Sequence, residues 1–384
     1  MGISFPHIQI ITHDSDVMFY NDGIELHSGN DVENYRYRDY VKRYIPLDKY
    51  SAIVMISNCV DNIDGTIIYL KAKNITNVYF YIDDVFRLSL SPNIGYLNSY
   101  CEAKIIEDII EKCNLSKYHI YHCERMEKNE TQLKLFDNPS YLDLFLLEYS
   151  KNDLFKKYKI NNDFSKKISC LNNRYEHHRY LITSLLCHNK DTFLTFNDTD
   201  SLEGIKDRIE PLINRLSDIN KQKYFDNRST FTSRFGEMKH FLTGEHQHST
   251  EPLNMIKKGF VNIISETTFM VPYQYISEKS LKPMAVYRPF IMLGPAGNLA
   301  LLRDMGFKTF SKWWDESYDN EPDHVKRVEM VYDIANYILN KSYDEIHQMF
   351  EEMRDILLYN RKQIRKIPNY FLYNLQPHLK PKFI

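Results

Sequence analysis

Three short apolar runs in the first half of the chain most constrain what it can fold into. They cover residues 7–12, 52–56 and 78–82, and each is rich in β-branched or aromatic side chains and stops at polar residues. Runs of this kind are typical of buried parallel strands with active groups at their carboxyl ends. Helix-like stretches separate them, so the pattern predicts a doubly wound α/β sheet. The helix-like stretches are residues 35–44, 65–73 and 103–113, and a further strand is expected at 118–123.

A second series of strands and helices follows a polar, lysine-rich segment at 151–167, which we expect to be the linker. Its strands are expected at 167–171, 192–196, 261–265 and 289–293, with helices at 175–187 and from 277. A chain of 384 residues is too long for one ordinary core and suits two domains. We predict domains at 1–160 and 166–340, followed by C-terminal helices at 341–384 that could cross back to the first domain. The segment 205–251 is expected to be a loop or helical insertion.

Composition excludes several classes of protein. The formal net charge is −2 and 26% of residues are charged, which is unlike a basic nucleic-acid coat or an acidic tail. The six cysteines are scattered without a C-x-x-C pair, a pattern that indicates reduced thiols. No secretion signal and no continuous apolar run long enough for a membrane span is visible. We therefore expect a cytoplasmic protein, in the host cytoplasm if a phage encodes it.

The stretch 262–319 contains the residues best suited to bind a nucleotide. A strand is expected to end at Glu266, and a helix to start at Ser277 as N-cap with Glu278 in its first turn. A second strand runs into Gly294, and another helix follows the glycine-containing turn. Helix starts of this kind can hold phosphate on backbone N–H groups. A lysine such as Lys279 neutralises diphosphate charge, and a glutamate accepts hydrogen bonds from ribose hydroxyls.

Three short sequence motifs in this stretch, called steps below, resemble those of a known family. They are SEK-x-x-KP at 277–283, GF-x-TF at 306–310 and DESYD at 315–319. The stretch resembles the donor-binding region of GT-B glycosyltransferases, in particular fucosyltransferase-like, exostosin-like and uncharacterised phage or viral enzymes. The resemblance implies two Rossmann-like α/β domains facing a central cleft. It implies donor-binding roles for Asn172, Arg174, Arg179, Glu266, Tyr275, Ser277, Glu278, Lys279, Lys282 and Gly294.

A second element, LNNRYEHHR at 171–179, lies at the first strand-to-helix turn of the second domain. The same families carry an LN-x-R-x-x-x-x-R stretch at this position. The resemblance implies that Arg174 meets the donor diphosphate and that Arg179 supports the turn. A guanidinium group suits phosphate because its fork donates two parallel hydrogen bonds. The alternative is that both arginines only solvate a helix face.

An inverting transferase also needs a base that removes the proton of the acceptor hydroxyl. Candidates in the first domain are Asp14, Asp16 or His13 after the first apolar run and Asp83 or Asp84 after the third. The segment VYFYIDDVFRL at 78–88 resembles phage DNA β-glucosyltransferases, which implies a base at Asp84 or Asp83. One of the two adjacent acids is expected to cap the element that follows.

These observations predict a metal-independent glycosyltransferase without a cofactor, for which a nucleotide-sugar is the donor substrate. The acceptor hypotheses are a hydroxymethylated pyrimidine in double-stranded phage DNA, or else a glycan, lipid or protein. A non-catalytic nucleotide-sugar binding module is the alternative from another class. A Rossmann dehydrogenase is disfavoured because no G-x-G-x-x-G follows the first strand, and a P-loop enzyme is excluded because G-K-[ST] is absent.

Overall fold

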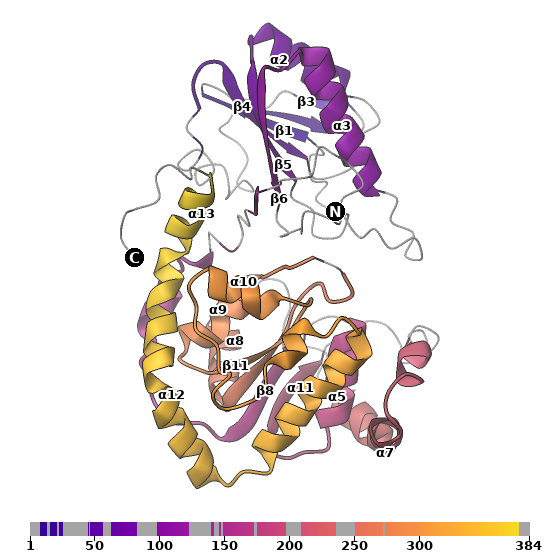
Figure 1. Cartoon of the computed structure of the whole chain (residues 1–384), viewed down its shortest axis with the longest axis vertical. Coiled ribbons are helices and arrows are strands. Elements are labelled where there is room, and N and C mark those ends of the chain that lie inside the picture. Colours follow the sequence, from indigo (N-terminus) through magenta and orange to yellow (C-terminus); the bar gives the residue numbers. More distant parts are fainter. Residues whose placement is uncertain are drawn as a thin grey trace. The chain divides into compact units, whose positions relative to one another are not determined.

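The computed structural model shows a chain that divides into two compact units (Figure 1). The first consists of Met1–Glu148, Val271–Tyr273 and Pro368–Ile384, and the second of Tyr149–Met270 and Gln274–Ile367. The structure describes residues 8–13, 16–20, 23–25, 45, 47–56, 63–82, 98–122, 140–141, 146, 149–172, 175–196, 209–235, 250–271 and 273–375.

The first unit contains a mixed sheet with the strand order β3-β2-β1-β4-β5-β6-β7 in its described part. Strands β4 to β7 run parallel to one another, whereas β1 pairs antiparallel with both β4 and β2, and β2 pairs antiparallel with β3. The strands are β1 (Ile8–Thr12), β2 (Asp16–Tyr20), β3 (Gly23–Glu25), β4 (Ser51–Ile56), β5 (Asn77–Ile82), β6 (Lys117–His122) and β7 (Ser140–Tyr141).

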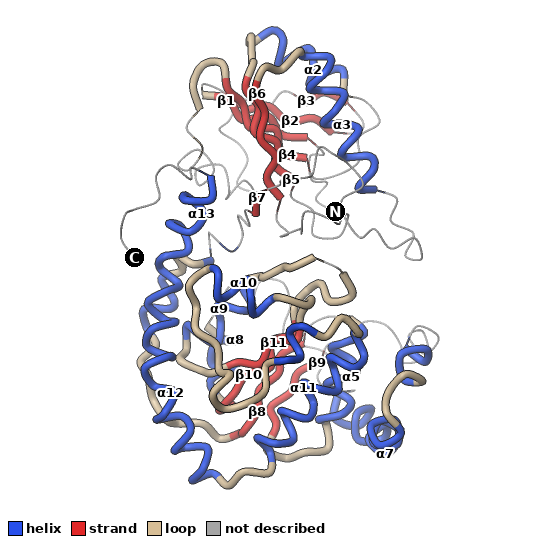
Figure 2. The backbone as a smooth tube through the Cα atoms, in the orientation of Figure 1, coloured by secondary structure: helices blue, strands red, loops and turns tan. Residues whose placement is uncertain are grey.

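Two helices, α2 (Asp64–Ala72) and α3 (Asn98–Cys113), pack on one face of this sheet (Figure 2). In α2 the buried apolar side chains Ile67 and Leu70 are three residues apart, which places them on one side of the helix. They join alternate residues of the central strands in a continuous apolar core. The predicted helices at 65–73 and 103–113 are confirmed, as is the strand at 118–123; residues 35–44 lie outside the described residues.

The parallel direction expected for the first apolar run is wrong. Strand β1 pairs antiparallel with β4, and its last residue, Thr12, faces Ala52 near the start of β4. Strand β1 therefore ends at the sheet edge opposite the carboxyl end of β5. The connection from β1 to β2 is too short for the crossover helix that a parallel neighbour requires, so β1 turns back in a hairpin with β2.

The second unit contains a four-stranded parallel sheet with the order β11-β10-β8-β9 in its described part. All seven residues of β10 are buried, as expected for a strand that is covered on both faces. This confirms the expected α/β class with Rossmann-like units and the four strands predicted here. The strands are β8 (Lys166–Asn172), β9 (Thr192–Phe196), β10 (Gly259–Ser265) and β11 (Phe290–Leu293).

Helices cover both faces of this sheet (Figure 2). Helices α5 (His177–Leu186) and α11 (His324–Leu339) lie on one face, and α8 (Glu251–Lys257) and α9 (Glu278–Ala285) on the other. The remaining helices are α7 (Asp218–Phe235), which packs on α5, α10 (Asn298–Asp304), α12 (Tyr343–Gln363) and α13 (Ile367–Leu375). Short 3₁₀ turns are η2 (Asp153–Lys157), η4 (Ser317–Asn320) and η5 (Ile364–Lys366).

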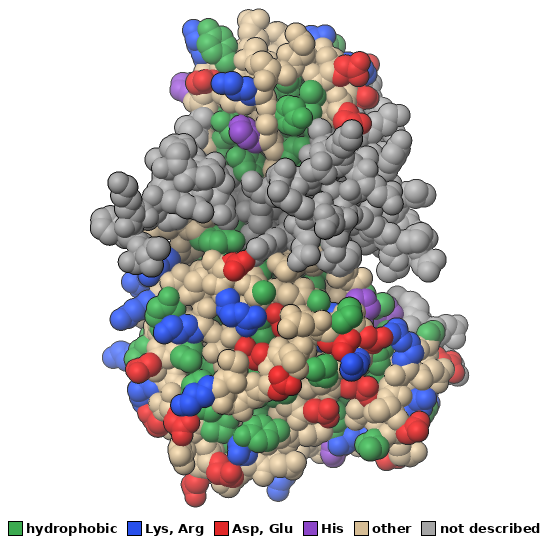
Figure 3. Space-filling model, viewed as in Figure 1, with side chains coloured by type: hydrophobic (Ala, Val, Ile, Leu, Met, Phe, Trp, Pro, Cys, Tyr) green, Lys and Arg blue, Asp and Glu red, His purple; other side chains and the backbone are tan. Residues whose placement is uncertain are grey.

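Two further sequence expectations concern the segments outside the sheets. Residues 151–167 belong to the second unit, where Phe155 and Phe164 are buried and Arg288 binds the carbonyls of Asn161 and Asp163. The insertion at 205–251 is mainly helical where it is described, and the C-terminal helices expected at 341–384 correspond to α12 and α13 up to residue 375. No helix in the described part of the chain is both long and apolar enough to cross a membrane. Figure 3 shows basic and acidic side chains interspersed over the visible face of the second unit.

Gly259 offers a test of how closely the two central strands approach. A Cβ at this position would lie 2.6 Å from the backbone nitrogen of Ser169 in β8, an atom that cannot move aside. We expect Gly259→Ala to destabilise the second unit by about 1–3 kcal/mol, the range for overpacking. Urea unfolding of the variant beside wild type measures this, and an unchanged midpoint would contradict the close approach.

Candidate functional site

The order of strands in the second unit identifies the place where a ligand is expected. The chain leaves β8 toward β9 on one side and later adds β10 and β11 on the other. The connections therefore diverge between β8 and β10, which is the topological switch point of the sheet. Open parallel sheets bind ligands in the crevice outside the carboxyl ends of the strands at this point. Here those ends are Asn172 and Ser265.

Glu266, the residue after β10, is fully buried and links the elements around the switch point. Its carboxylate accepts hydrogen bonds from the backbone N–H of Ser277 at 3.1 Å, from the Ser277 hydroxyl at 2.6 Å and from the Ser280 hydroxyl at 2.7 Å. These bonds hold the first turn of α9 against the end of β10. Glu266 was predicted to bind a donor. In the structure its buried carboxylate binds Ser277 and Ser280 and so connects the end of β10 to α9.

Helix α9 begins as the sequence predicted. Ser277 is its N-cap, and the Ser277 hydroxyl accepts a hydrogen bond from the backbone N–H of Lys279 at 3.3 Å. The Lys279 ammonium group donates to the Thr267 hydroxyl at 2.8 Å, and its side chain stays 31% exposed. Burial lowers the pKa of Lys279, and the nearby Arg179 acts in the same direction, whereas Glu278 and Glu266 oppose it. An ammonium group that keeps partial access to solvent here can bind an anion.

Glu278 and Lys282 form an ion pair one turn apart on α9. The ammonium of Lys282 lies 3.1 Å from a carboxylate oxygen of Glu278, and that oxygen is 3.7 Å from the Lys279 ammonium. Burial acts to raise the pKa of Glu278, but the two lysines outweigh it and hold the pKa at about 2. Glu278 is therefore a carboxylate at neutral pH and accepts hydrogen bonds only.

The first turn of α5 reaches the same place from the other side of the switch point. The Arg179 guanidinium donates to the backbone carbonyl of Glu266 at 2.8 Å, and Nε2 of His178 lies 2.9 Å from that carbonyl. Both side chains are buried, and His178 also stacks on Phe269 with ring centroids 4.4 Å apart. Burial, together with Arg179, lowers the pKa of His178 well below its usual range, so the imidazole is neutral at pH 7.

Asn172 closes the end of β8. Its side chain is buried, and its amide nitrogen donates to the Thr183 hydroxyl at 3.0 Å. Its carbonyl oxygen is buried without a hydrogen-bond partner in the described part of the chain. A buried acceptor of this kind at a strand's carboxyl end needs a partner such as water or a ligand.

Gly294 and Tyr275 are packed around Asn298, the first residue of α10. Asn298 accepts a hydrogen bond from the Tyr275 backbone N–H at 3.0 Å and donates to the Tyr275 carbonyl at 2.6 Å. A Cβ on Gly294 would collide with the Asn298 amide and lie 3.3 Å from Cγ of Glu266. Gly294 is therefore required by close packing beside Glu266, and the Tyr275 side chain is buried.

The helix start after Gly294 holds a carboxylate from the protein itself, which corrects the expectation that it could hold phosphate. Asp319 accepts hydrogen bonds from the backbone N–H groups of Leu299 at 2.9 Å and Ala300 at 3.1 Å in α10. An anion is favoured at a helix N-terminus, and Asp319 fills that position. The predicted DESYD step therefore supplies the cap of α10.

Other residues of the DESYD motif form hydrogen bonds with the GF-x-TF motif and with β11. Glu316 accepts hydrogen bonds from the Phe310 backbone N–H at 2.6 Å and from the Thr309 hydroxyl at 2.7 Å. The Tyr318 hydroxyl accepts a hydrogen bond from the Met292 backbone N–H in β11 at 3.0 Å. These contacts join the loop after α10 to the edge strand of the sheet.

Sequence reasoning missed two buried arginines. Arg327 donates to the carbonyls of Gly294 at 2.8 Å and Glu321 at 2.8 Å, and its guanidinium lies 5.1 Å from the Phe269 ring. Arg288 donates to carbonyls at the opposite end of β11, including that of Lys257. Neither lies in a recognisable motif, so only the fold reveals them. Arg327 connects the carboxyl end of β11 to the aromatic ring that stacks on His178.

Four residues predicted to act in the site lie outside the described residues. They are Arg174 at the end of β8 and the candidate bases Asp14, Asp83 and Asp84. The structure brings together Glu266, Ser277, Glu278, Lys279, Lys282 and Arg179 around the ends of β8 and β10.

No known protein family matches the chain, and no curated protein matches it either. The solved structures that match the chain include the N-terminal domain of trehalose-6-phosphate phosphatase from Candida albicans, with 12% identity and a TM-score of 0.31 over 84% of this chain and 62% of that one. They also include AviGT4, a glycosyltransferase involved in avilamycin A biosynthesis, with 11% identity and a TM-score of 0.32 over 81% of this chain and 79% of that one. This chain thus spans less than two thirds of the length of the first. At this level of similarity, function has to be argued from the site.

The Glu278 ion pairs predict how stability depends on pH. The pKa of Glu278 is lower in the folded chain than in the unfolded one. Its contribution to the free energy of unfolding is therefore complete above about pH 4.5 and is lost as the pH falls toward 2. We expect Glu278→Gln to lower the free energy of unfolding at pH 7 by up to about 3 kcal/mol. The difference in the free energy of unfolding between wild type and Glu278→Gln should become smaller below pH 4.5.

Urea unfolding at several pH values measures the effect of Glu278→Gln. Asp355→Asn, at an exposed position on α12, is the matched control and should show no comparable pH-dependent loss. A wild-type advantage over Glu278→Gln that stays constant from pH 7 to pH 3 would refute the assigned ion pairs.

Proposed function

We propose that this chain is a glycosyltransferase that moves a sugar from a nucleotide-sugar donor to an acceptor hydroxyl. One observation carries the proposal: a partly exposed ammonium, Lys279, lies in the first turn of α9 beside Arg179 and the ionised Glu278, at the switch point of a parallel sheet. This arrangement combines positive charge for a diphosphate with a carboxylate acceptor for hydroxyl groups.

The chemistry of sugar transfer explains why these groups would be needed. When the bond to the anomeric carbon breaks, negative charge develops on the departing diphosphate. Fixed positive groups in a partly buried site stabilise that charge more than water does. In the proposal Lys279 supplies this stabilisation, Arg174 shares the role that the sequence resemblance implies for it, and Glu278 accepts hydrogen bonds from the ribose. Glu266, Ser277 and Ser280 fix the position of α9, so they are positioning residues.

The proposal requires no metal ion, because cationic side chains take the role that a metal would have at the diphosphate. The acceptor proton would be removed by Asp84 or Asp83, which follow β5. A hydroxymethylated pyrimidine in phage DNA or a glycan, lipid or protein would supply the hydroxyl, and a DNA base would have to be flipped out of the duplex. The acceptor hypotheses rest on the sequence resemblance alone.

Removal of the Lys279 charge tests the donor site. We expect nucleoside diphosphates to raise the melting temperature of wild type, because a ligand bound only by the folded state stabilises it. Lys279→Met should weaken that binding about 10- to 100-fold, corresponding to loss of charge-assisted hydrogen bonds. Lys326→Met, on the exposed face of α11, is the matched control and should bind normally. Equal binding by all three proteins would exclude Lys279 from the donor site.

The candidate base is tested separately by turnover. Asp84→Asn and Asp83→Asn should leave donor binding intact, and the variant that removes the base should slow sugar transfer about 10²- to 10⁴-fold, the usual contribution of a general base. Transfer to hydroxymethylated DNA and to glycans is followed with a radiolabelled donor. Donor binding without transfer by wild type to any acceptor of these classes would favour the non-catalytic binding module.

A further inference from the structure

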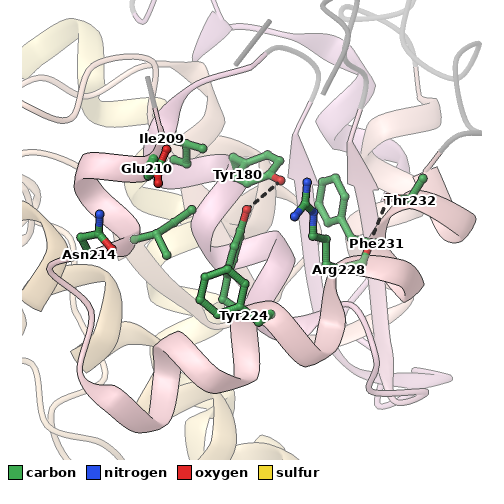
Figure 4. Close-up of a pocket in the computed structure, with 10 residues that line it drawn as sticks. Tyr180, Ile209, Glu210, Asn214, Tyr224, Arg228, Phe231 and Thr232 are labelled. Atoms are coloured by element: carbon green, nitrogen blue, oxygen red, sulfur yellow. Dashed lines mark hydrogen bonds between the residues drawn. The ribbon is translucent and has the colours of Figure 1, made fainter. Parts of the chain in front are cut away.

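A cavity of about 100 Å³ lies between α5, α7 and the helical turn at 209–213, away from the ion pairs described above. Figure 4 shows the hydroxyl groups of Tyr180 and Tyr224 meeting between the two helices, with Arg228 extending beside the Phe231 ring. Nothing in the arrangement of α9 or Glu266 involves this cavity, so it requires its own explanation.

Four aromatic side chains, together with aliphatic and polar ones, line the cavity. The ring of Tyr180 lies 5.0 Å from that of Phe231 and 6.2 Å from that of Tyr224, measured between centroids. Phe225 lies at the wall, with 51% of its surface exposed and its ring 5.4 Å from that of Tyr224. At these spacings the rings contact one another, and the cavity borders the ring surface that this packing leaves uncovered. The walls therefore favour a planar aromatic ligand.

The polar groups of the cavity suit a ring whose edge carries both donors and acceptors. The Tyr180 and Tyr224 hydroxyls are 3.2 Å apart, and this hydrogen bond uses only one of their two protons. The Arg228 guanidinium forms no ion pair with any carboxylate that the structure describes, so its donors are available at the wall. A pyrimidine ring carries carbonyl oxygens and ring nitrogens in its plane, which match these groups.

The size of the cavity selects among aromatic rings. An apolar cavity of about 150 Å³ accommodates one benzene molecule in a protein interior. At about 100 Å³ this cavity is smaller than that, so it takes at most one six-membered ring, part of which stays at the rim beside the exposed Phe225. The fused rings of a purine exceed this space, so the cavity should reject purines.

The position of the cavity connects it to the proposed donor site. Tyr180 directly follows Arg179 on α5, and it also contacts Phe196 at the carboxyl end of β9, with ring centroids 5.9 Å apart. The cavity is thus at the carboxyl edge of the same sheet, on the β9 side of the switch point. One helix presents Arg179 toward Glu266 and Tyr180 toward α7.

We propose that this cavity binds the pyrimidine base of the nucleotide donor. The proposal rests on the proposed function, because it assigns the base while the first turn of α9 takes the phosphates. The base lies in the cavity against the rings of Tyr180, Tyr224 and Phe231, and its polar edge meets the two tyrosine hydroxyls and Arg228. The donor is therefore a uridine, cytidine or thymidine diphosphate sugar.

Calorimetric titration of the full chain with UDP, CDP, ADP and GDP tests this assignment. Wild type should bind UDP or CDP at least about tenfold more tightly than ADP and GDP, as expected when a pocket fits one ring and excludes a larger one. Thr232→Phe fills the space at an exposed cavity residue and should abolish the preference, while ADP binding stays unchanged. Arg228→Gln, also exposed, should reduce the preference without the steric change. Arg365→Gln, an exposed arginine in η5, is the control.

The outcomes separate this inference from the proposed function. If all four diphosphates bind wild type equally, or if the pyrimidine preference survives in Thr232→Phe and in Arg228→Gln, the base lies elsewhere and the donor-site proposal stands. If no diphosphate binds wild type, both proposals fail. Should Thr232→Phe not fold, as judged by circular dichroism, Arg228→Gln decides between these results.

Discussion

The buried carboxylate of Glu266 is the group on which the geometry of the second unit's site depends. A carboxylate without access to water is costly unless hydrogen bonds compensate for its lost hydration. Glu266 receives them from the backbone and hydroxyl of Ser277 and from the Ser280 hydroxyl, all in the first turn of α9. The start of α9 therefore has a fixed position relative to β10. Lys279 and Glu278 are held in place as well, because they belong to the same turn.

The backbone of Glu266 extends the same connection to α5. Its carbonyl accepts hydrogen bonds from Arg179 and lies within hydrogen-bond distance of His178. Helices on opposite faces of the sheet thus meet at one residue after β10. Because a neutral His178 is packed against Phe269, and Phe269 against Arg327, the hydrogen bonds and ring contacts continue to the end of β11. A rigid framework of this kind can hold charged groups in a constant geometry for a ligand.

The motifs that stand out in the sequence have two different kinds of role in the structure. The SEK step forms the first turn of α9, with its lysine partly exposed to solvent. The DESYD step instead caps α10 through Asp319 and holds the edge of β11 through Tyr318. Both roles use acidic residues near a helix start, so spacing alone cannot separate them. What separates them is whether the charged group reaches solvent or an internal N–H group.

The sequence by itself determined the position of the central strands β4 to β6 and β8 to β11, of helices α2, α3 and α5, and of the start of α9. Apolar periodicity and N-cap chemistry are local properties, and β8 to β11 and Ser277 followed from them. Only the tertiary structure decided the direction of β1, the occupant of the α10 N-terminus and the roles of Arg288 and Arg327. These depend on contacts between residues far apart in the chain: Thr12 with Ala52, Asp319 with Leu299, and Arg327 with Gly294. A local pattern records none of these pairings, because strand pairing and burial are decided by the fold as a whole.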